Sequence, residues 1–278
     1  MAASQMRSAR PQCVLLNGTS VTTAQAESMM YADTAAGRVE AAPGLQGTCP
    51  SCGQPCRPRC GTININHWAH QARADCDPWS EPMTEWHWRW QQIVPPDRRE
   101  VVMGGHRADI VTASGGVVEM QHSPISAEAI EAREAFYGDR MAWIFDATAP
   151  FAAGRIDVES RRGEWDHIWW KHARRSLEAC RRPVLLDLGN GIVLHLASAI
   201  LVEAYGQRWW RPVLNMEGRG WCRPLTRQSV EAWLAVGGRW DVQRVPEAHG
   251  RKSRGCRCGG CPAALKDAPP PPMVERLT

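Results

Sequence analysis

Lysine, tyrosine and phenylalanine are scarce in this sequence of 278 residues, and it contains no long apolar run. The longest apolar stretch, about residues 192–202, includes His195 and is far shorter than the roughly 20 residues that a membrane-spanning helix needs. The first residues, MAASQMRSARPQC, lack the apolar segment of a secretory signal peptide. We therefore expect a cytoplasmic protein without a membrane partner.

The scarcity of lysine makes arginine the main cation. Lysine stands only at Lys171, Lys252 and Lys266, so arginine supplies 30 of the 33 basic side chains. A GC-rich genome favours arginine codons and is the simplest explanation of this bias. The net charge of +4 permits binding to nucleic acid without requiring it. The 14 tryptophans far outnumber the three tyrosines and three phenylalanines; most are expected in the core, and a few can stack on bases.

The composition is otherwise that of a globular protein. Hydrophobic residues make up 44% and charged residues 22%, which excludes wholesale disorder. The length allows one large domain or two smaller ones. Eleven cysteines without a signal peptide argue for metal sites and free thiols rather than for a disulfide framework.

Shifts in composition divide the chain into five segments. Residues 1–45 form a strand-rich lead segment, and residues 46–78 are dense in Cys, Pro, Gly and His, as in a small module stapled by a metal. Residues 79–150 carry clear helix and strand patterns and form the predicted α/β core. Residues 151–245 are a mixed helix and strand extension, and residues 246–278 are a basic, Cys-rich and Pro-rich tail that we expect to be partly disordered.

Apolar spacing and turn residues predict the individual elements. Predicted strands are Cys13–Leu16, Arg38–Ala41, Glu100–Met103, His106–Thr112, Val117–Gln121 and Met141–Phe145. Predicted helices are Glu81–Ile93, Ile125–Tyr137 with Ser126 as its N-cap, Trp165–Arg181 and Thr226–Val236. The stretch Pro183–Leu196 reads as a hairpin, because Gly189-Asn190-Gly191 supplies residues that tolerate positive φ.

The first group of chemistry-bearing residues is Cys49-Pro-Ser-Cys52 followed by His67-Trp-Ala-His70. Two thiolates on one turn and a later pair of histidines can close a tetrahedral zinc site of the structural kind. The spacing therefore predicts Cys49, Cys52, His67 and His70 as zinc ligands. It leaves open whether Cys56, Cys60 or Cys76 replaces one of the histidines.

A second group lies on the predicted strands around HRADIV and VVEMQ. Asp109 and Glu119 fall on neighbouring antiparallel strands, where two carboxylates can converge on a hard divalent cation. Gln121 lies on the same strand face as Glu119, because side chains alternate with period two. The spacing alone is a weak signal, since surface carboxylates are more often solvated or ion-paired.

The motifs HRADI, VVEMQHSPIS and EAREAFYG, with the preceding TEWHWRWQ, together resemble the CoiA-like competence protein family. The CPSC and HWAH elements also resemble that family, so the likeness spans about residues 49–145. It implies an α/β (α+β) fold: a restriction-endonuclease-like PD-(D/E)xK core at 79–150, with an N-terminal zinc-ribbon-like module and a mixed C-terminal extension. In this branch the final motif lysine is a glutamine, giving E-x-Q.

The resemblance also implies roles for individual residues. Asp109 and Glu119 become the ligands of a catalytic Mg²⁺ or Mn²⁺, and Gln121 takes the place of the motif lysine. Either Glu85 or His87, on the predicted helix before the sheet, completes the catalytic site. A glutamine cannot act as a cationic base, so activation of water falls to the metal. The resemblance further places Arg133 and Tyr137 where they support the sheet or contact a phosphate.

A third group, Cys256, Cys258 and Cys261, lies in the basic tail. It could hold a second zinc, with His249 or Cys222 as the fourth ligand, but its spacing is unlike that of the usual zinc sites. A flexible, thiol-bearing tail is the equally weighted alternative.

These observations lead to a main hypothesis and a rival. The main hypothesis is a metal-dependent DNA nuclease that hydrolyses phosphodiester bonds in DNA uptake, recombination or defence. Its expected partners are DNA, as single strands or processed intermediates, and recombination proteins. The rival is a catalytically inactive, zinc-containing DNA-binding or scaffold protein of the competence machinery. Convergence of Asp109 and Glu119 on one point distinguishes the two, because a binding protein has no need of it.

Overall fold

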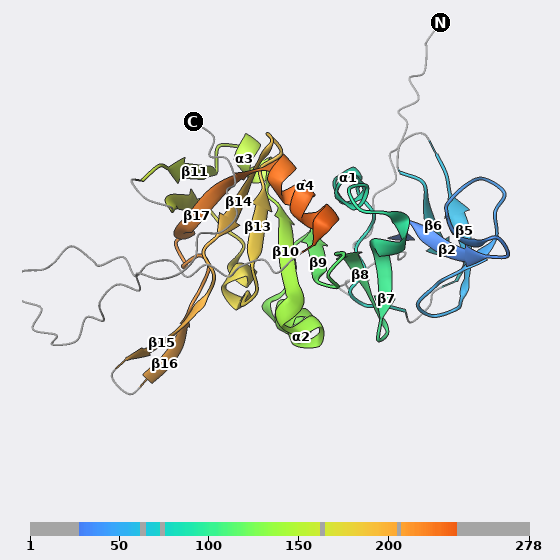
Figure 1. Ribbon diagram of the computed structural model, residues 1–278, viewed down its shortest axis with the longest axis horizontal. Coiled ribbons are helices and arrows are strands. Elements are labelled where there is room, and N and C mark those ends of the chain that lie inside the picture. Colours follow the sequence, from blue (N-terminus) through green and yellow to red (C-terminus); the bar gives the residue numbers. More distant parts are fainter. Residues whose placement is uncertain (1–27, 62–64, 73–75, 162–164, 205–206, 238–278) are drawn as a thin grey trace, which may run out of the picture.

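The computed structural model describes residues 28–61, 65–72, 76–161, 165–204 and 207–237, with only the backbone described for 200–211. Its fold is mixed α+β, built on two large sheets. The smaller sheet lies beyond the β7 edge of the larger one, and the hairpin of β15 (Ile200–Ala204) and β16 (Gln207–Arg211) projects from the other end (Figure 1). The predicted strand Cys13–Leu16 and the Cys256, Cys258 and Cys261 group lie outside the described residues.

Short strands of the N-terminal segment form the smaller sheet, in the order β1-β6-β5-β4-β2-β3. These strands are β1 (Ser28–Met29), β2 (Tyr31–Thr34), β3 (Gly37–Glu40), β4 (Gly47–Thr48), β5 (Pro55–Arg59) and β6 (His67–His70). Their core centres on Trp68 and Met29 with the thiols of Cys49 and Cys56. A core this small supplies little hydrophobic stabilisation, so a metal staple is physically reasonable here.

The larger sheet has nine strands in the order β11-β12-β17-β14-β13-β10-β9-β8-β7. The strands are β7 (Arg99–Met103), β8 (His106–Val111), β9 (Val117–Gln121), β10 (Met141–Asp146), β11 (Ile156–Glu159), β12 (Asp166–Trp170), β13 (Val184–Asp187), β14 (Ile192–Leu196) and β17 (Arg219–Thr226). Strands β9, β10 and β13 run parallel, and the other pairs are antiparallel.

Helices cover both faces of the larger sheet. They are α1 (Glu85–Gln91), α2 (Ala127–Tyr137), the short α3 (Thr148–Ala152) and α4 (Arg227–Val236), with 3₁₀ turns η1 (Pro96–Arg98), η2 (Gly138–Arg140) and η3 (Arg175–Ala179). Strand β10 is buried on both faces: Trp143 packs with Ile130 of α2, whereas Ile144 packs in the cluster that holds α1 and α4. None of the helices in the described ranges is long and apolar enough to cross a bilayer.

Several predicted elements are confirmed. The strands from β7 to β10, the hairpin of β13 and β14 and the helix α4 fall where the pattern places them. Ser126 caps α2 by accepting the backbone N–H of Ala129. In the N-terminal segment, β3 matches the predicted strand Arg38–Ala41.

The predicted helix Trp165–Arg181 is wrong, because this segment holds β12 followed by η3. Ile168 and Trp170 point into the core and His167 and Trp169 point outward, so burial follows the period of a strand rather than that of a helix. Strands of residues 151–226 also extend the sheet itself, continuing it beyond β10, rather than packing against it as a separate layer.

Asp187, at the end of β13, ties the sheet to two of its helices. Its carboxylate is almost fully buried and accepts the indole N–H groups of Trp86 and Trp90, each at 2.9 Å, while Arg227 of α4 lies 3.4 Å away. A buried carboxylate with several charge-assisted donors leaves all of them unsatisfied when it is removed.

We therefore predict that Asp187→Ala lowers the free energy of unfolding by about 3 kcal/mol, because the buried donors lose their acceptor. Denaturant unfolding followed by circular dichroism measures this change. Asp139→Ala is the matched control: its side chain is 75% exposed and pairs only with Arg182, so we expect a loss of less than about 1 kcal/mol. Equal stability of the two variants would contradict the assigned role of Asp187.

Candidate metal centres

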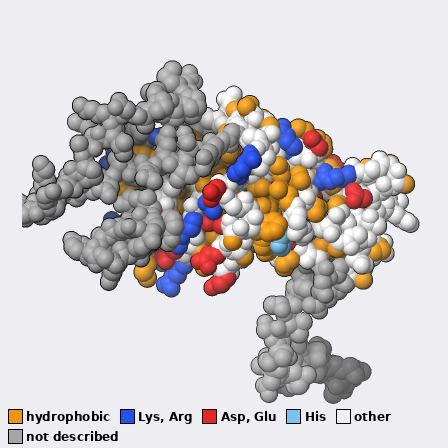
Figure 2. All heavy atoms as spheres, turned by 60° about the horizontal axis from the view of Figure 1, so that its bottom comes forward, with side chains coloured by type: hydrophobic (Ala, Val, Ile, Leu, Met, Phe, Trp, Pro, Cys, Tyr) orange, Lys and Arg blue, Asp and Glu red, His pale blue; other side chains and the backbone are white. Residues whose placement is uncertain are grey.

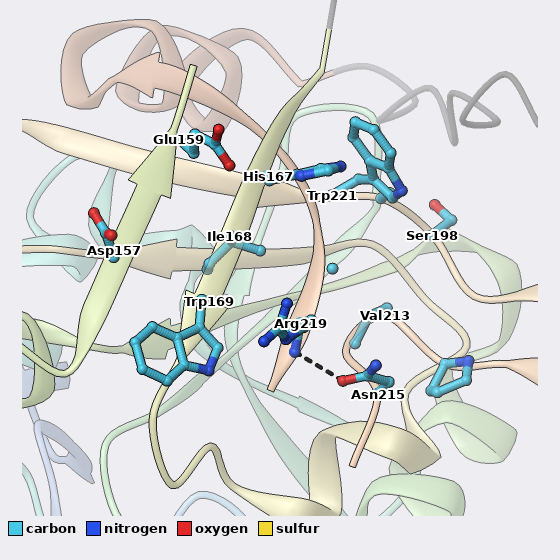
Figure 3. Close-up of a pocket in the computed structure, with 13 residues that line it drawn as sticks. Asp157, Glu159, His167, Ile168, Trp169, Ser198, Val213, Asn215, Arg219 and Trp221 are labelled. Atoms are coloured by element: carbon cyan, nitrogen blue, oxygen red, sulfur yellow. Dashed lines mark hydrogen bonds between the residues drawn. The ribbon is translucent and has the colours of Figure 1, made fainter. Parts of the chain in front are cut away.

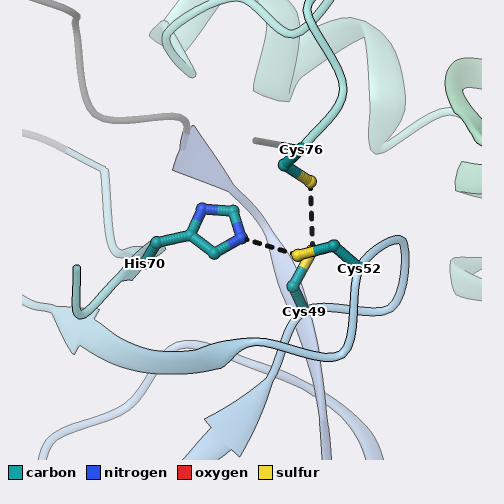
Figure 4. A group of neighbouring side chains, drawn as sticks. All are labelled: Cys49, Cys52, His70 and Cys76. Atoms are coloured by element: carbon teal, nitrogen blue, oxygen red, sulfur yellow. Dashed lines mark hydrogen bonds between the residues drawn. The ribbon is translucent and has the colours of Figure 1, made fainter. Parts of the chain in front are cut away.

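Three thiols and one imidazole converge beside the smaller sheet (Figure 4). The ligand atoms of Cys49, Cys52, His70 and Cys76 all lie within 4.8 Å of one another. The Sγ atoms of Cys49 and Cys76 are 3.6 Å apart, and Nε2 of His70 is 3.2 Å from Sγ of Cys52. Three sulfurs and one nitrogen in this arrangement are the donor set of a closed structural zinc site. This group could therefore bind zinc.

The predicted ligand His67 lies outside this group, and Cys76 supplies the fourth donor instead. The reason is the secondary structure: residues 67–70 form strand β6, and residues three apart on a strand point to opposite faces. The ring of His67 lies 2.9 Å from the carbonyl of Ile65 through Nδ1. Of the other cysteines left open, Cys56 is buried on β5 and Cys60 is exposed, and neither belongs to the group. Cys222 is buried in the core of the larger sheet.

The turn between β4 and β5 forms the two-cysteine knuckle. The backbone N–H of Gly53 donates to the carbonyl of Cys49 at 2.8 Å, and Gly53 adopts a φ of 71° that glycine accepts without strain. The Cys56 thiol and backbone N–H groups of the turn stabilise the Cys49 thiolate and lower its pKa. Burial and the Cys49 charge raise the pKa of Cys76. A cation is thus needed before all the thiols can ionise together.

Two carboxylates meet where strands β8 and β9 separate. The ladder between these strands ends at the pair Ile110 and Val118, one step before Asp109 and Glu119. In place of the next ladder bond, the backbone N–H of Met120 donates to Oδ2 of Asp109 at 2.7 Å. Asp109 and Glu119 line the same small cavity. The structure therefore brings together the two acidic residues that the strand pattern selected.

Glu119 is almost fully buried and only half satisfied. Its Oε2 accepts from Nη1 of Arg133 at 2.8 Å, and Oε1 has no hydrogen-bond partner among the described residues. Gln121 is also only half satisfied. Its side-chain N–H₂ donates to Glu81 and to the carbonyl of Ser123, whereas its Oε1 has no hydrogen-bond partner among the described residues. Two buried oxygens without donors favour a cation or an ordered water beside them.

Glu81 is a third carboxylate at this site, and sequence reasoning missed it. It lies before α1 and accepts the backbone N–H groups of His122 at 3.2 Å and Ser123 at 3.4 Å, in addition to the Gln121 amide. The predicted helix began at Glu81, but Thr84 caps a helix that begins only at Glu85. The acidic residue comes from the segment before the helix, so the helical spacing gave no signal for it.

The two residues expected from the helix have different positions. Glu85 is exposed and pairs with Arg89 one turn later, away from the other carboxylates. His87 lines the cavity, with Nδ1 2.8 Å from the Thr84 hydroxyl and Nε2 3.1 Å from the carbonyl of Met120. A carbonyl can only accept, so Nε2 carries the proton. Burial lowers the pKa of His87 to about 4, so the ring stays neutral near pH 7 and forms a wall of the site.

The charge balance of this cavity is acidic. Its volume is about 20 Å³, room for one water or one small cation. The charged side chains that line it are those of Glu81, Glu100, Asp109, Glu119, Arg107 and Arg133. Burial, and next the charge of Glu119, raises the pKa of Asp109 well above its usual range. Burial also raises the pKa values of Glu119 and Glu81, so a bound cation would relieve a real electrostatic cost.

A histidine and carboxylate pair borders this site. His122 follows β9 directly, and its Nδ1–H donates to Oδ2 of Asp146, the last residue of β10, at 2.6 Å. Arg174 holds the segment by donating to the carbonyls of His122 and Ser123. The His122 side chain is 45% exposed, and its ring centroid lies 6.3 Å from that of His87.

The Cys₃His group and the carboxylate site lie in one mixed α+β protein, the first of them in its N-terminal module. Residues 46–78, which contain all four donors, match the family model of the N-terminal domain of competence protein CoiA. The resemblance to the CoiA-like family is thereby confirmed, on a match to this segment of the chain. No curated protein and no solved structure gives a significant match.

The zinc assignment predicts a sharp difference between two substitutions. The purified full-length chain should contain one equivalent of zinc at the N-terminal module, and Cys76→Ser should lower its zinc affinity by at least about tenfold, because one of four donors is lost. His67→Ala should retain the metal, since His67 lies outside the group. Metal analysis by plasma mass spectrometry after dialysis measures both. Loss of zinc from His67→Ala together with retention by Cys76→Ser would refute the donor set.

Proposed function

We propose that this protein is a metal-dependent DNA nuclease, with a restriction-endonuclease-like PD-(D/E)xK core centred on strands β7 to β10. The observation that carries the proposal is the meeting of Asp109, Glu119 and Glu81 around one small cavity. A binding protein has no need to gather three acidic groups that are buried or partly buried, because each raises the cost of folding at neutral pH.

The order of elements supports this core. An antiparallel unit of β7, β8 and β9 is followed by the crossover helix α2 and the parallel strand β10. The residues of the E-x-Q motif fall on β9, the strand that pairs with both β8 and β10. The motif is thereby held in the interior of the sheet, where its side chains have fixed positions.

The residues present fit a hard divalent cation. Asp109 and Glu119 offer carboxylate oxygens, and Oε1 of Glu119 has no donor in the part of the chain that the structure describes. Oxygen donors of this kind suit Mg²⁺ or Mn²⁺ rather than zinc. When bound, such a cation supplies Lewis-acid polarisation of a phosphate oxygen and acidifies a water.

The chain's own residues then have separable tasks. Arg133 donates to Glu119 and so lowers the electrostatic cost of holding that carboxylate ionised. Glu81 fixes the amide of Gln121, which directs the other end of the amide, Oε1, as an acceptor for a water proton. Since glutamine cannot take up that proton, His122 is the candidate acceptor: Asp146 engages Nδ1–H and leaves Nε2 as the basic atom.

The proposed substrate is DNA in single-stranded or processed form, handled together with recombination proteins in uptake, recombination or defence. One face of the molecule shows positive and negative side chains interspersed around a central hydrophobic area (Figure 2). Where this face is drawn in colour, basic side chains alternate with acidic ones, so we expect DNA binding to rely on local contacts rather than on a general positive field.

The second candidate function is an inactive DNA-binding or scaffold protein of the competence machinery. The ion pair between Arg133 and Glu119 favours it, because this pair can hold the carboxylate without any cation. The two functions differ in what a divalent cation does to the protein. The nuclease binds the cation and needs it for cleavage, whereas the scaffold protein does not.

The raised pKa values of Asp109 and Glu119 predict a pH-dependent loss of stability. A carboxyl whose pKa is raised by folding stabilises the folded state fully below its unfolded pKa, and this contribution disappears as the pH rises through the folded value. In divalent-free buffer without chelator, Asp109→Asn should therefore gain thermal stability over the wild type between about pH 5 and pH 8. Millimolar Mn²⁺ should raise the melting temperature of the wild type only, by a few degrees.

Scanning calorimetry at several pH values measures these differences. Asp139→Asn is the control, because Asp139 is exposed. Its melting temperature should stay close to the wild-type value at every pH, with and without Mn²⁺. A wild type that does not respond to Mn²⁺ would favour the scaffold function.

Cleavage of labelled single- and double-stranded DNA tests the nuclease directly. With Mg²⁺ or Mn²⁺, we expect Asp109→Asn, Glu119→Gln and Glu81→Gln each to lower the rate by about 100-fold or more, because each removes a charge from the cation site. Glu85→Gln should cut at the wild-type rate, since Glu85 lies on the solvent face of α1.

His122→Ala should slow cleavage by about 100-fold and change its pH profile, because the proton acceptor is lost. Absence of cutting by the wild type, with DNA binding intact, would support the scaffold function instead.

A further inference from the structure

A second and much larger cavity lies at the other end of the nine-stranded sheet (Figure 3). Its volume is about 500 Å³, and strands β11, β12 and β17 supply one wall. Four strands separate β12 from β9, which carries the E-x-Q motif. This cavity is therefore distinct from the carboxylate site.

Strand pairing arranges aromatic and charged side chains in rows across this wall. Trp169 of β12 stands opposite Arg219 of β17, and His167 stands opposite Trp221. These residues share one face, because Ile168 between them is buried in the core. The result is a platform in which each aromatic ring lies beside a positively charged or imidazole side chain (Figure 3).

The platform exposes an unusual amount of aromatic surface. Trp169 is 46% exposed, and the Arg219 side chain beside it is 68% exposed. His167 and Trp221 are in edge contact, with ring centroids 3.8 Å apart, which fixes the other end of the platform. The Nε of Arg219 lies 3.3 Å from Oε2 of Glu217, an exposed pair that a phosphate can displace. An indole beside this guanidinium suits a flat ligand with a phosphate, since the indole stacks and the guanidinium binds phosphate.

A polar group that lacks a partner among the described residues lies next to the Trp221 end of the platform, since the backbone N–H of Ala197 donates to the carbonyl of Trp221. Ser198 is 8% exposed, lines the cavity, and its Oγ forms no hydrogen bond within the described part of the chain. A buried hydroxyl without a partner costs free energy unless a ligand or water satisfies it. A purely apolar ligand would leave it unsatisfied.

We infer that this cavity binds an unpaired nucleotide of a single-stranded DNA. The base stacks on Trp169, its polar edge reaches Ser198, and the adjoining phosphate pairs with Arg219. Asp157 and Glu159, on the edge strand β11 opposite Trp169 and His167, repel phosphate and so direct the backbone toward Arg219. A base inside a duplex cannot enter, because both of its faces are already stacked.

Fluorescence anisotropy of a labelled 12-nucleotide single strand tests this site, using the full-length chain in divalent-free buffer so that no cleavage interferes. We expect Trp169→Ala to weaken binding by about tenfold or more, and Arg219→Ala to weaken it and to reduce its salt dependence. Trp169→Phe keeps a stacking ring and should bind within about threefold of the wild type.

Trp88→Ala and Arg89→Ala are the matched controls, because both residues are exposed on the solvent face of α1. They should bind as the wild type does. Thermal melting of every variant separates loss of binding from loss of fold.

Unchanged affinity of Trp169→Ala overturns the inference, as does competition by a short oligosaccharide or by the matching duplex at equal concentration. The outcome is independent of the proposed nuclease. If the wild type cuts DNA while Trp169→Ala binds DNA normally, the cavity is not a nucleotide site and the proposed nuclease still stands. If the protein does not cut DNA but its binding of DNA depends on Trp169, the nucleotide site stands and the proposed nuclease is refuted.

Discussion

The six residues from Cys76 to Glu81 connect the Cys₃His group with the carboxylate site, and the arrangement of both depends on them. Cys76 completes the thiol group, and the buried carboxylate of Asp77 accepts the backbone N–H of Arg107 at 2.7 Å and contacts His106. The carbonyl of Trp79 accepts from Arg133, and Glu81 reaches the carboxylate site. A displacement at one end of so short and so firmly bonded a segment must be transmitted to the other end.

Glu100 provides a second connection, between the smaller and the larger sheet. This residue is buried, has a φ of 46°, and accepts the backbone N–H groups of Met30 and Tyr31 from the smaller sheet. Arg38 adds bonds from the smaller sheet to the carbonyls of Pro96 and Arg99. The N-terminal module is thus a support for the β7 edge of the larger sheet, and a zinc ion held by its Cys₃His group would add to the rigidity of the carboxylate site.

The sequence allows the strands around the E-x-Q motif to be predicted, because alternation and glycine turns are local properties. It also selects Asp109, Glu119 and Gln121, which the structure brings to one place. It could not reveal Glu81, could not decide for Cys76 among the three cysteines that it left open, and could not reveal the strand β12. The first two depend on the path of an irregular segment, and the third on pairing with β17, whose partner residues lie about 50 positions later. Pairing over such a separation overrides local propensity.

The strand order of the larger sheet also governs when it can form. Strand β10 lies between β9 and β13, and β17 lies between β14 and β12, so the middle of the sheet is assembled from segments far apart in the chain. During synthesis, β7 to β10 leave the ribosome before the other strands of this sheet. The edge of β10 that later pairs with β13 stays unpaired until β13 has been made. Such an edge is open to wrong partners, and closing long loops is slow. The consequence is a sheet that closes late, with the edge of β10 exposed to aggregation until residues 184–187 have been made.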